Sequence, residues 1–544
     1  MTLSGMGRLD GRSAGLGAVA GVLAAGAALG VGQFVAGLTG ASGSPVVVVG
    51  ELQIDFTPPW LKNFAITEFG ADDKLVLVTG IVVVLGAFAA LVGAAATRRM
   101  AYGMAGIAVF AAVGLTAAAT RPHATVASLL PTLAAIASAV AVFYLLIPLV
   151  RPPVRPAARA VSYDPVTGPA EPETVPAEIG EPELAATDGS PRRSFLAAGA
   201  ATAGIAAGAG LAGRLLTERS SVAGAQKSLR IPKPAVTTQA LPPGVDLNIP
   251  GLSPFVTPNG KFYRVDTALA LPQVDPSSWQ LRVHGMVDRE VTLTFDQLIK
   301  RPLIEDYITL CCVSNPVDGP YIGNAKWLGA SLAALLRQAG IKAGADQLLC
   351  TSVDGFTSGT PVQTVMDGRD ALLAVAMNGQ PLPIAHGFPA RMVVPGLYGY
   401  VSATKWVTDI EVTAFAGNYA YWAQRGWSQR APIKTECRID VPNGLEEIIA
   451  GRTAVAGVAW AQHKGVEAVE VRVDRGPWQE ARLAAVPGLD TWRQWVWEWD
   501  APSGGHVLEA RATDKTGYTQ TALQAPPPPN GASGYPAVSV TVTG

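Results

Sequence analysis

The chain has 544 residues and a formal net charge of −1, with 49% hydrophobic and 15% charged residues. Its mean hydropathy of +0.27 is too apolar for an ordinary soluble enzyme. The charge balance leaves no basic surplus to neutralise phosphates, so nucleic acid is excluded as the expected partner. Because the apolar residues concentrate near the start, we expect a membrane anchor followed by a soluble C-terminal half.

Four long apolar runs in residues 1–150 predict four transmembrane helices, because each is near the roughly 20 residues that cross a hydrocarbon core. The runs are about Gly15–Leu38, Leu75–Ala96, Ala101–Ala119 and Val126–Val150. Arginines flank them on one side if the N-terminus is cytoplasmic, as the positive-inside rule requires. These arginines are Arg8, Arg12, Arg98, Arg99, Arg151 and Arg155.

Residues 151–190 are rich in Pro, Ala and Glu, which predicts a flexible cytoplasmic linker. Residues 191–217 are weakly apolar and predict a fifth transmembrane helix. It opens with Pro191-Arg-Arg-Ser-Phe-Leu196, which resembles a twin-arginine export signal, although an arginine pair can also be a plain cytoplasmic anchor. We therefore expect a multi-pass protein of the cell membrane whose C-terminal half is extracytoplasmic. Ala223-Gly-Ala225 offers a cleavage site of the small-x-small kind, but we expect the chain to stay uncut.

Haem inside a helical bundle needs facing axial ligands, usually histidines. Of the five histidines in the chain, His123 alone lies before residue 284. No intrinsic haem is therefore expected, and electrons have to pass to a separate electron-transfer protein or a quinone.

The soluble half divides into a linker at 218–248, a mixed domain at 249–432 and an all-β domain at 433–544. The mixed domain is predicted to be α+β, with strands at Trp279–Gly285, Leu348–Val353, Met392–Val394 and Trp406–Val412, and helices at Leu293–Leu298 and Leu328–Gly340. The last domain alternates apolar and polar residues in short runs, which predicts a β-sandwich. These runs are Ala454–Trp460, Val466–Val473, Trp492–Trp499, His506–Arg511 and Ala537–Val542.

All four cysteines lie in the soluble half, and none has the spacing of a structural zinc site. Cys311 and Cys312 are adjacent and would point to opposite faces of an extended chain. At most one of them can easily ligate a buried metal, and by themselves both fit core positions. Cys350 and Cys437 are expected in the core.

Two segments suggest chemistry. The first is Tyr307-Ile-Thr-Leu-Cys-Cys-Val-Ser-Asn315, which leads into Ile322-Gly-Asn-Ala-Lys-Trp-Leu-Gly329. The second is His386-Gly-Phe-Pro-Ala-Arg391, and it ends in Ser402-Ala-Thr-Lys-Trp406. A thiolate can anchor a soft transition metal, and cations set among glycines can hold a phosphate. At these residues the chain resembles the sulfite oxidase family of molybdopterin enzymes, over roughly the last 300 residues.

The resemblance implies a molybdenum–molybdopterin (Mo-pyranopterin) cofactor, with Cys312 as the metal ligand and catalytic residue. It also implies that the sandwich is an immunoglobulin-like dimerisation domain, so a homodimer is a candidate assembly. The cofactor-binding positions that it implies are Asn259, Tyr263, Arg264, Cys312, Ser352, His386, Arg391, Ser402, Thr404 and Lys405. For Asn259, Tyr263 and Ser352, capping of backbone groups in turns is an equal alternative.

Two departures bear on the substrate. Sulfite oxidases carry arginines directly after Cys-x-x-Asn, where this chain has Pro316, Val317 and Asp318. The family's early Arg-Asn-His segment is represented by Arg264-Val-Asp-Thr267, without the histidine. The expected function is oxygen-atom exchange with a small substrate, either sulfite-like oxidation or reduction of an S- or N-oxide. The alternative is a non-catalytic surface protein with a degenerate cofactor domain.

Overall fold

The structure is a computed structural model that describes residues 11–39, 43–58, 61, 64, 73–121, 124–151, 191–219, 221–444 and 447–544. The predicted linker, apart from Arg151, and His123 lie outside the described residues. The chain divides into two compact units. The first is Met1–Leu52 with Leu77–Ser220, and the second is Gln53–Val76 with Ser221–Gly544.

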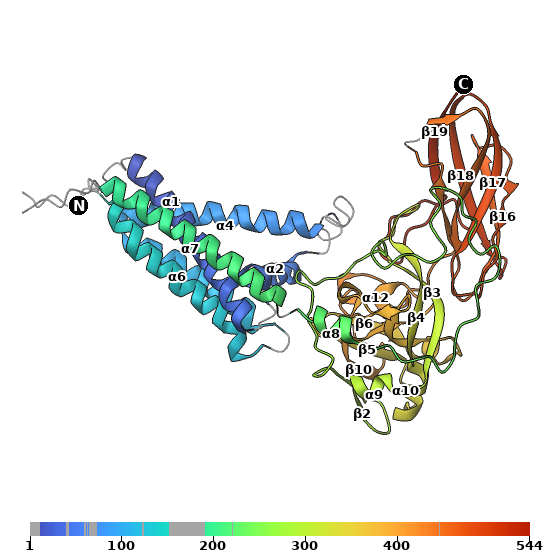
Figure 1. The fold of residues 1–544 in the computed structure, drawn as a ribbon, viewed down its shortest axis with the longest axis horizontal. Coiled ribbons are helices and arrows are strands. Elements are labelled where there is room, and N and C mark those ends of the chain that lie inside the picture. Colours follow the sequence, from blue (N-terminus) through green and yellow to red (C-terminus); the bar gives the residue numbers. More distant parts are fainter. Residues whose placement is uncertain are drawn as a thin grey trace, which may run out of the picture. The chain divides into compact units, whose positions relative to one another are not determined.

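The first unit is built from apolar helices (Figure 1). The helices of this part of the chain are α1 (Gly11–Thr39), α2 (Pro45–Phe56), α4 (Asp73–Arg98), α5 (Met100–Ala119), α6 (Val126–Val150) and α7 (Pro191–Arg219). Within the described residues, five segments are long and apolar enough to cross a membrane: Gly11–Thr39, Lys74–Arg98, Met100–Ala119, Val126–Val150 and Arg192–Ser228. The predicted number and position of apolar helices are thus confirmed. Helix α2 was not predicted, and its 12 residues are too few to span a bilayer.

Helix α1 packs closely on two neighbours because glycines face them. A Cβ atom at Gly21 would overlap the carbonyl oxygen of Ala89 on α4, and one at Gly30 would overlap that of Ala206 on α7. In a membrane, helices attract one another mainly through such close backbone packing.

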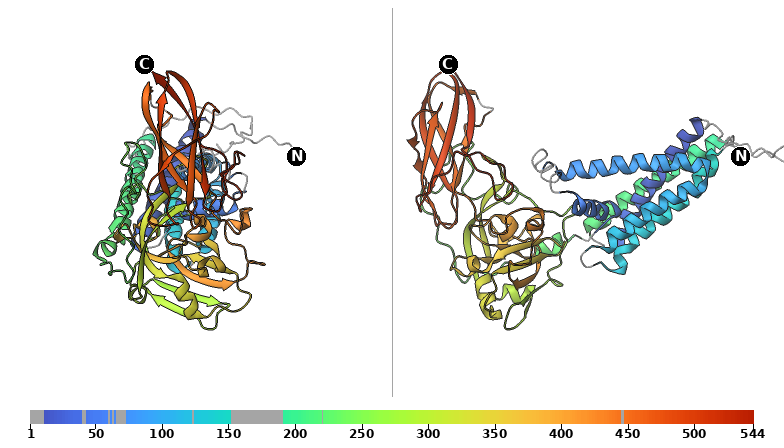
Figure 2. Two further views of the ribbon diagram at one scale, coloured as in Figure 1. Left: turned by 90° about the vertical axis from the view of Figure 1, so that its right-hand side faces the viewer. Right: turned by 180° about the vertical axis from the view of Figure 1, so that it is seen from behind.

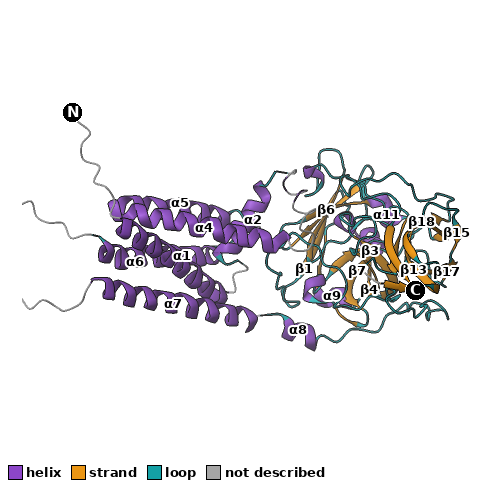
Figure 3. Ribbon diagram, turned by 90° about the horizontal axis from the view of Figure 1, so that it is seen from above, coloured by secondary structure: helices purple, strands orange, loops and turns teal. Residues whose placement is uncertain are grey.

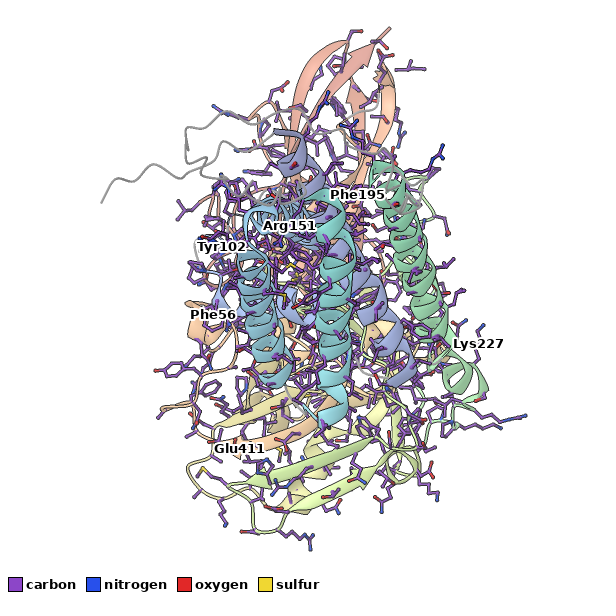
Figure 4. All side chains as sticks on the ribbon, turned by 90° about the vertical axis from the view of Figure 1, so that its left-hand side faces the viewer. Phe56, Tyr102, Arg151, Phe195, Lys227 and Glu411 are labelled. Carbon is purple, nitrogen blue, oxygen red and sulfur yellow. The ribbon has the colours of Figure 1, made fainter. Side chains whose placement is uncertain are left out.

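Arg151, which follows α6, donates to the carbonyl oxygen of Ala96 near the end of α4 at 2.7 Å. Figure 4 shows Arg151, Tyr102 and Phe195 toward the same end of the helices. A cation therefore satisfies a carbonyl group at the C-terminal end of a neighbouring helix.

The second unit contains the predicted α+β domain, in which short helices accompany one mixed and one antiparallel sheet (Figure 3). One sheet has the order β2-β1-β10-β5-β6, and the other has the order β3-β4-β7-β8 with β9 also paired to β7. The strands are β1 (Gln280–Gly285), β2 (Val291–Thr294), β3 (Leu303–Cys311), β4 (Ile322–Ser331), β5 (Gln347–Ser352), β6 (Thr357–Pro361), β7 (Leu372–Met377), β8 (Gln380–Pro381), β9 (Arg391–Val393) and β10 (Val407–Thr413). The short helices are α8 (Ala223–Ser228), α9 (Phe295–Ile299), α10 (Leu332–Ala339), α11 (Val362–Met366), η2 (Ile384–His386), α12 (Gly399–Ser402) and η3 (Ala423–Arg425).

Both predicted helices of this domain begin later than expected, because the residues predicted to start them belong to β-strands. Residues up to Ser331 belong to β4 and pair with β7, so α10 starts at Leu332. Ser331 caps α10 by accepting from the Ala334 amide. Likewise β2 pairs with β1 up to Thr294, and α9 follows it. The four other predicted strands of the domain lie within a residue or two of β1, β5, β9 and β10.

Residues 433–544 form two facing sheets, with strand orders β11-β13-β17-β16 and β12-β19-β18-β14-β15 (Figure 2). Their strands are β11 (Glu436–Val441), β12 (Glu447–Ile449), β13 (Gly451–Trp460), β14 (Val466–Val473), β15 (Gln479–Glu480), β16 (Arg482–Leu483), β17 (Arg493–Ala501), β18 (Gly504–Asp514) and β19 (Ala537–Thr543). One core joins the two sheets, with Val455 and Trp495 from the first and Val469 and Leu508 from the second. The predicted β-sandwich is confirmed, and its immunoglobulin-like character stays a prediction.

The loop after Cys312 is fastened to this sandwich. Asp318 accepts a hydrogen bond from the Ile439 amide at 2.9 Å. Arg438 donates to the carbonyl oxygen of Gly319 at 2.9 Å and to the Ser253 hydroxyl at 2.8 Å. Asp318 and its neighbours therefore have a structural role.

Candidate active site

Cys312 lies one residue beyond the end of β3, in a turn that hydrogen bonds hold on both sides. Its amide donates to the carbonyl oxygen of Tyr321 at 2.9 Å, and the Asn315 amide donates to the carbonyl oxygen of Cys312 at 3.1 Å. The Asn315 side-chain oxygen accepts from the Tyr321 amide at 2.7 Å. The asparagine of the Cys-x-x-Asn motif thus shapes the turn that presents the thiol.

The two adjacent cysteines have different surroundings. Cys311 is fully buried in the core, and burial raises the pKa of its thiol well above the usual value. Cys312 is half-buried. Burial raises its pKa as well, but a hydrogen bond with Ser314, whose Oγ lies 2.8 Å from the Cys312 sulfur, opposes that rise. Cys312 is therefore the better placed of the two to bind a metal.

Lys405 is held by Asp266, whose role the sequence did not reveal. The ammonium group of Lys405 lies 2.7 Å from the Asp266 carboxylate. The same carboxylate contacts Arg264 at 2.8 Å and Lys74 at 2.6 Å. Lys74 belongs to the same compact unit as the other three residues. Burial would raise the pKa of Asp266, but Lys405, Arg264 and Lys74 hold it well below its usual range. One carboxylate thus meets three cations, and this cluster keeps a positive charge.

Arg391 is buried over the Trp327 ring, with its guanidinium carbon 5.1 Å from the ring centroid. It donates to three carbonyl oxygens, those of His386 at 3.1 Å, Ala403 at 3.2 Å and Met392 at 3.3 Å. Burial lowers its pKa to about 10. The bond to Ala403 therefore links the two predicted cofactor segments, a role that the expected phosphate contact did not include.

His386 and Lys405 both have lowered pKa values. Burial, together with Arg391 and Lys405, lowers the pKa of His386 to about 4, so its imidazole is neutral at pH 7. Burial lowers the pKa of Lys405 to about 8, although the nearby Asp266 carboxylate counteracts this. An anionic ligand at this place would raise both pKa values again.

Tyr263 is coupled to both thiols and to Arg391. Burial raises its pKa well above the usual value, the Cys312 and Cys311 thiols add to the rise, and Arg391 opposes it. Its ring stacks on Phe262, with 5.2 Å between centroids. Phe262 in turn lies edge-on to His386 at 5.6 Å. The early loop therefore lies against the His386 segment and near the Cys312 thiol, and the cofactor-binding role of Tyr263 stays a prediction.

Several other predicted positions bond within the protein. The Ser402 hydroxyl donates to the carbonyl oxygens of Leu397 and Tyr398 at 3.0 Å each, and Thr404 pairs with the Ser358 hydroxyl at 2.6 Å. The side-chain nitrogen of Asn259 donates to the carbonyl oxygen of Met377, and its side-chain oxygen accepts from the side chain of Asn378. For Asn259, the bond to a carbonyl oxygen is consistent with the alternative in which its side chain serves the backbone, and the cofactor-binding roles of Ser402 and Thr404 stay predictions.

Of the buried side-chain polar atoms that lack a hydrogen-bond partner among the described residues, two belong to the predicted motif and cofactor positions. They are the Ser352 hydroxyl and the Asn315 side-chain nitrogen. Buried polar groups are nearly always paired, so such atoms suit a ligand that carries many polar atoms. The half-buried Lys405 and the buried Arg391 are cations that suit a ligand with an anionic end. A phosphorylated pterin fits this donor set.

The metal itself would need ligands from its cofactor. Within the described residues, no group of three or more His, Cys, Asp or Glu side chains could hold a metal ion. Cys312 would therefore be joined by the sulfur ligands of the pterin, as the predicted cofactor requires.

Comparisons with known proteins agree with this arrangement. The family model described as "Oxidoreductase molybdopterin binding domain" matches residues 268–422, which include Cys312, Arg391 and Lys405. The sulfite oxidase of Gallus gallus is 30% identical over 322 residues, covering 50% of this chain and 69% of that protein. The uncharacterized oxidoreductase YuiH of Bacillus subtilis is 31% identical over 156 residues, covering 29% of this chain and 75% of that protein.

The match to a mammalian relative covers a smaller share of both chains than the match to the Gallus gallus protein. The mitochondrial sulfite oxidase of Rattus norvegicus is 30% identical over 288 residues, covering 45% of this chain and 52% of that protein. The chain thus spans about half the length of this relative.

Proposed function

Because this chain belongs to the sulfite oxidase family of molybdopterin-dependent oxidoreductases, we propose that it is a membrane-anchored enzyme of that kind. It exchanges an oxygen atom with a small substrate on the extracytoplasmic side of the membrane. One observation carries the proposal. A half-buried thiol, Cys312, lies in a braced turn, near the half-buried side chains of Tyr263 and Lys405.

Each of these side chains has a task in the proposed site. Cys312 holds the metal, and Lys405 binds the anionic end of the pterin. Arg391 adds positive charge and holds the two segments together. Protonated Tyr263 can donate a proton near the thiol, and neutral His386 can donate or accept one beside Arg391 and Lys405. When bound, the molybdenum cofactor supplies the oxygen-atom exchange and the two-electron redox change.

The loop after Cys312 bears on the substrate class. Pro316, Val317 and Asp318 supply no cation there, and Asp318 is bound to the sandwich. This supports reduction of a neutral S- or N-oxide at least as well as oxidation of sulfite, which is an anion. Electrons then pass to or from a separate electron-transfer protein or a quinone, and the sandwich serves as the homodimer contact.

The full chain, purified from membranes in detergent, tests the proposal through its molybdenum and pterin content. We expect molybdenum stoichiometric with the chain. Turnover of sulfite, with an artificial electron acceptor, is then compared with turnover of S- and N-oxides, with an artificial donor. A chain that folds without molybdenum or pterin would instead support the alternative of a non-catalytic surface protein.

A further inference from the structure

Ser314 lies two residues after Cys312 in the same turn, and its side chain contacts the Cys312 sulfur. Its Oγ lies 2.8 Å from the Cys312 sulfur. The turn fixes this pair, because the Asn315 amide and side chain bond to Cys312 and Tyr321 on either side of it. The side chain of the intervening Val313 is buried, which orients the segment.

The direction of this hydrogen bond is decided by the chemistry of the sulfur. A metal binds cysteine as the thiolate, which carries no proton. A thiolate can only accept, so the Ser314 hydroxyl has to be the donor once the metal is bound. The Cys311 sulfur lies elsewhere, 3.5 Å from the carbonyl oxygen of Cys312, and does not compete for the hydroxyl.

We infer that Ser314 is a positioning residue that sets the reduction potential of the metal through its hydrogen bond to the Cys312 sulfur. A donor aimed at a metal-bound sulfur draws electron density away from the metal and stabilises the reduced state. It therefore raises the potential. The inference rests on the proposed function, since it concerns the metal that Cys312 would hold.

Three substitutions separate the hydroxyl from the size of the side chain. Ser314→Ala removes the donor, Ser314→Thr keeps a hydroxyl, and Ser314→Val has the shape of threonine without the hydroxyl. Each full-length holoenzyme is titrated with redox mediators, and the Mo(V) signal is followed by electron paramagnetic resonance. Molybdenum and pterin contents are measured in the same samples.

We expect the alanine and valine variants to keep their molybdenum, but the bound metal should be harder to reduce. At a fixed ambient potential the ratio of Mo(VI) to Mo(V) should rise about tenfold, which for a one-electron couple is a shift of about 59 mV to more negative potential. The threonine variant should stay near the wild type. A purely structural role for Ser314 would not produce this split between threonine and valine.

Two other outcomes would overturn the inference in different ways. Equal potentials in all four molybdenum-loaded proteins would contradict it and leave the proposed function standing. Wild-type protein without molybdenum would overturn the proposed function, and this inference with it.

Discussion

Cys311 and Cys312 show how the environment of one residue decides its chemistry. Cys311 ends a strand inside the core, whereas Cys312 opens the turn that Asn315 holds. The two side chains are identical, and the difference between them lies in burial and in the hydroxyl of Ser314.

We expect Cys312→Ser to abolish activity and to lower molybdenum content while the fold is kept, because a ligand is lost with little change in volume. Cys311→Ala is the matched control. It should keep the metal and cost roughly 1 kcal/mol of stability through lost burial. Metal content, turnover and thermal unfolding are compared in both variants. Equal loss of molybdenum from the two would refute the assignment of Cys312 as the ligand.

Glu436 at the start of β11 is a buried acid whose Oε1 has no hydrogen-bond partner among the described residues. Burial raises its pKa to about 8 from 4.5, although Lys434 opposes the rise. The folded protein therefore binds a proton that the unfolded chain has released above about pH 4.5. This contribution to stability is fully present at low pH and is lost as the pH rises toward 8.

Glu436→Gln should remove this contribution to the pH dependence. Relative to the wild type, the variant should gain stability between pH 5 and pH 9, on the order of 2–4 kcal/mol. The measurement is the unfolding midpoint of both proteins at each pH. Burial also raises the pKa of Asp318, to about 6. The dependence of stability on pH will therefore not vanish completely in the variant. Parallel curves for the two proteins would show that Glu436 titrates normally.

At the scale of elements, α1 offers a direct test of close helix packing. Gly21 faces the backbone of α4, while Gly26 on the same helix has open space around its Cβ position. Gly21→Leu should therefore force α1 and α4 apart and destabilise the helical unit by roughly 1–3 kcal/mol.

Gly26→Leu is the control for the gain in side-chain size, and it should be close to neutral. Thermal unfolding of the full chain in detergent compares the two variants. If both variants lower the unfolding midpoint equally, the role of Gly21 in packing α1 on α4 is refuted.

For the whole molecule, we predict that the direction of the C-terminal half depends on the arginine pair at the start of α7. Arg192 and Arg193 are both exposed there, as a recognition signal requires. Arg192→Lys combined with Arg193→Lys preserves the charge and changes only recognition by the twin-arginine pathway. We expect the helices before α7 to insert while the C-terminal half stays in the cytoplasm.

Protease added outside intact cells measures this outcome. The wild-type C-terminal half should be cut, and that of the double variant should be protected. Outside access to the double variant would show that ordinary insertion suffices and that the arginine pair is only a charge anchor.

The sequence alone determined the features that depend on local composition. The apolar runs were long enough to predict their helices within a few residues, because length and hydropathy are properties of the run itself. Strands with a strict alternation, such as Val466–Val473, were predicted with the bounds of β14. The cofactor assignment rested on motifs at Cys312, His386 and Lys405, and the family comparison agrees with it.

Only the tertiary structure decided which long-range partners these residues take. Pairing with β7 made Leu328–Ser331 part of a strand, although the segment was predicted to begin a helix, because a central sheet position satisfies more backbone groups. Asp266 became the counter-ion of Lys405, 139 positions away in the sequence. Arg391 was expected to bind the phosphate of the cofactor. In the structure it donates hydrogen bonds to carbonyl oxygens of the protein. Buried charges must find partners, but the identity of each partner follows from chain topology, which local composition does not encode.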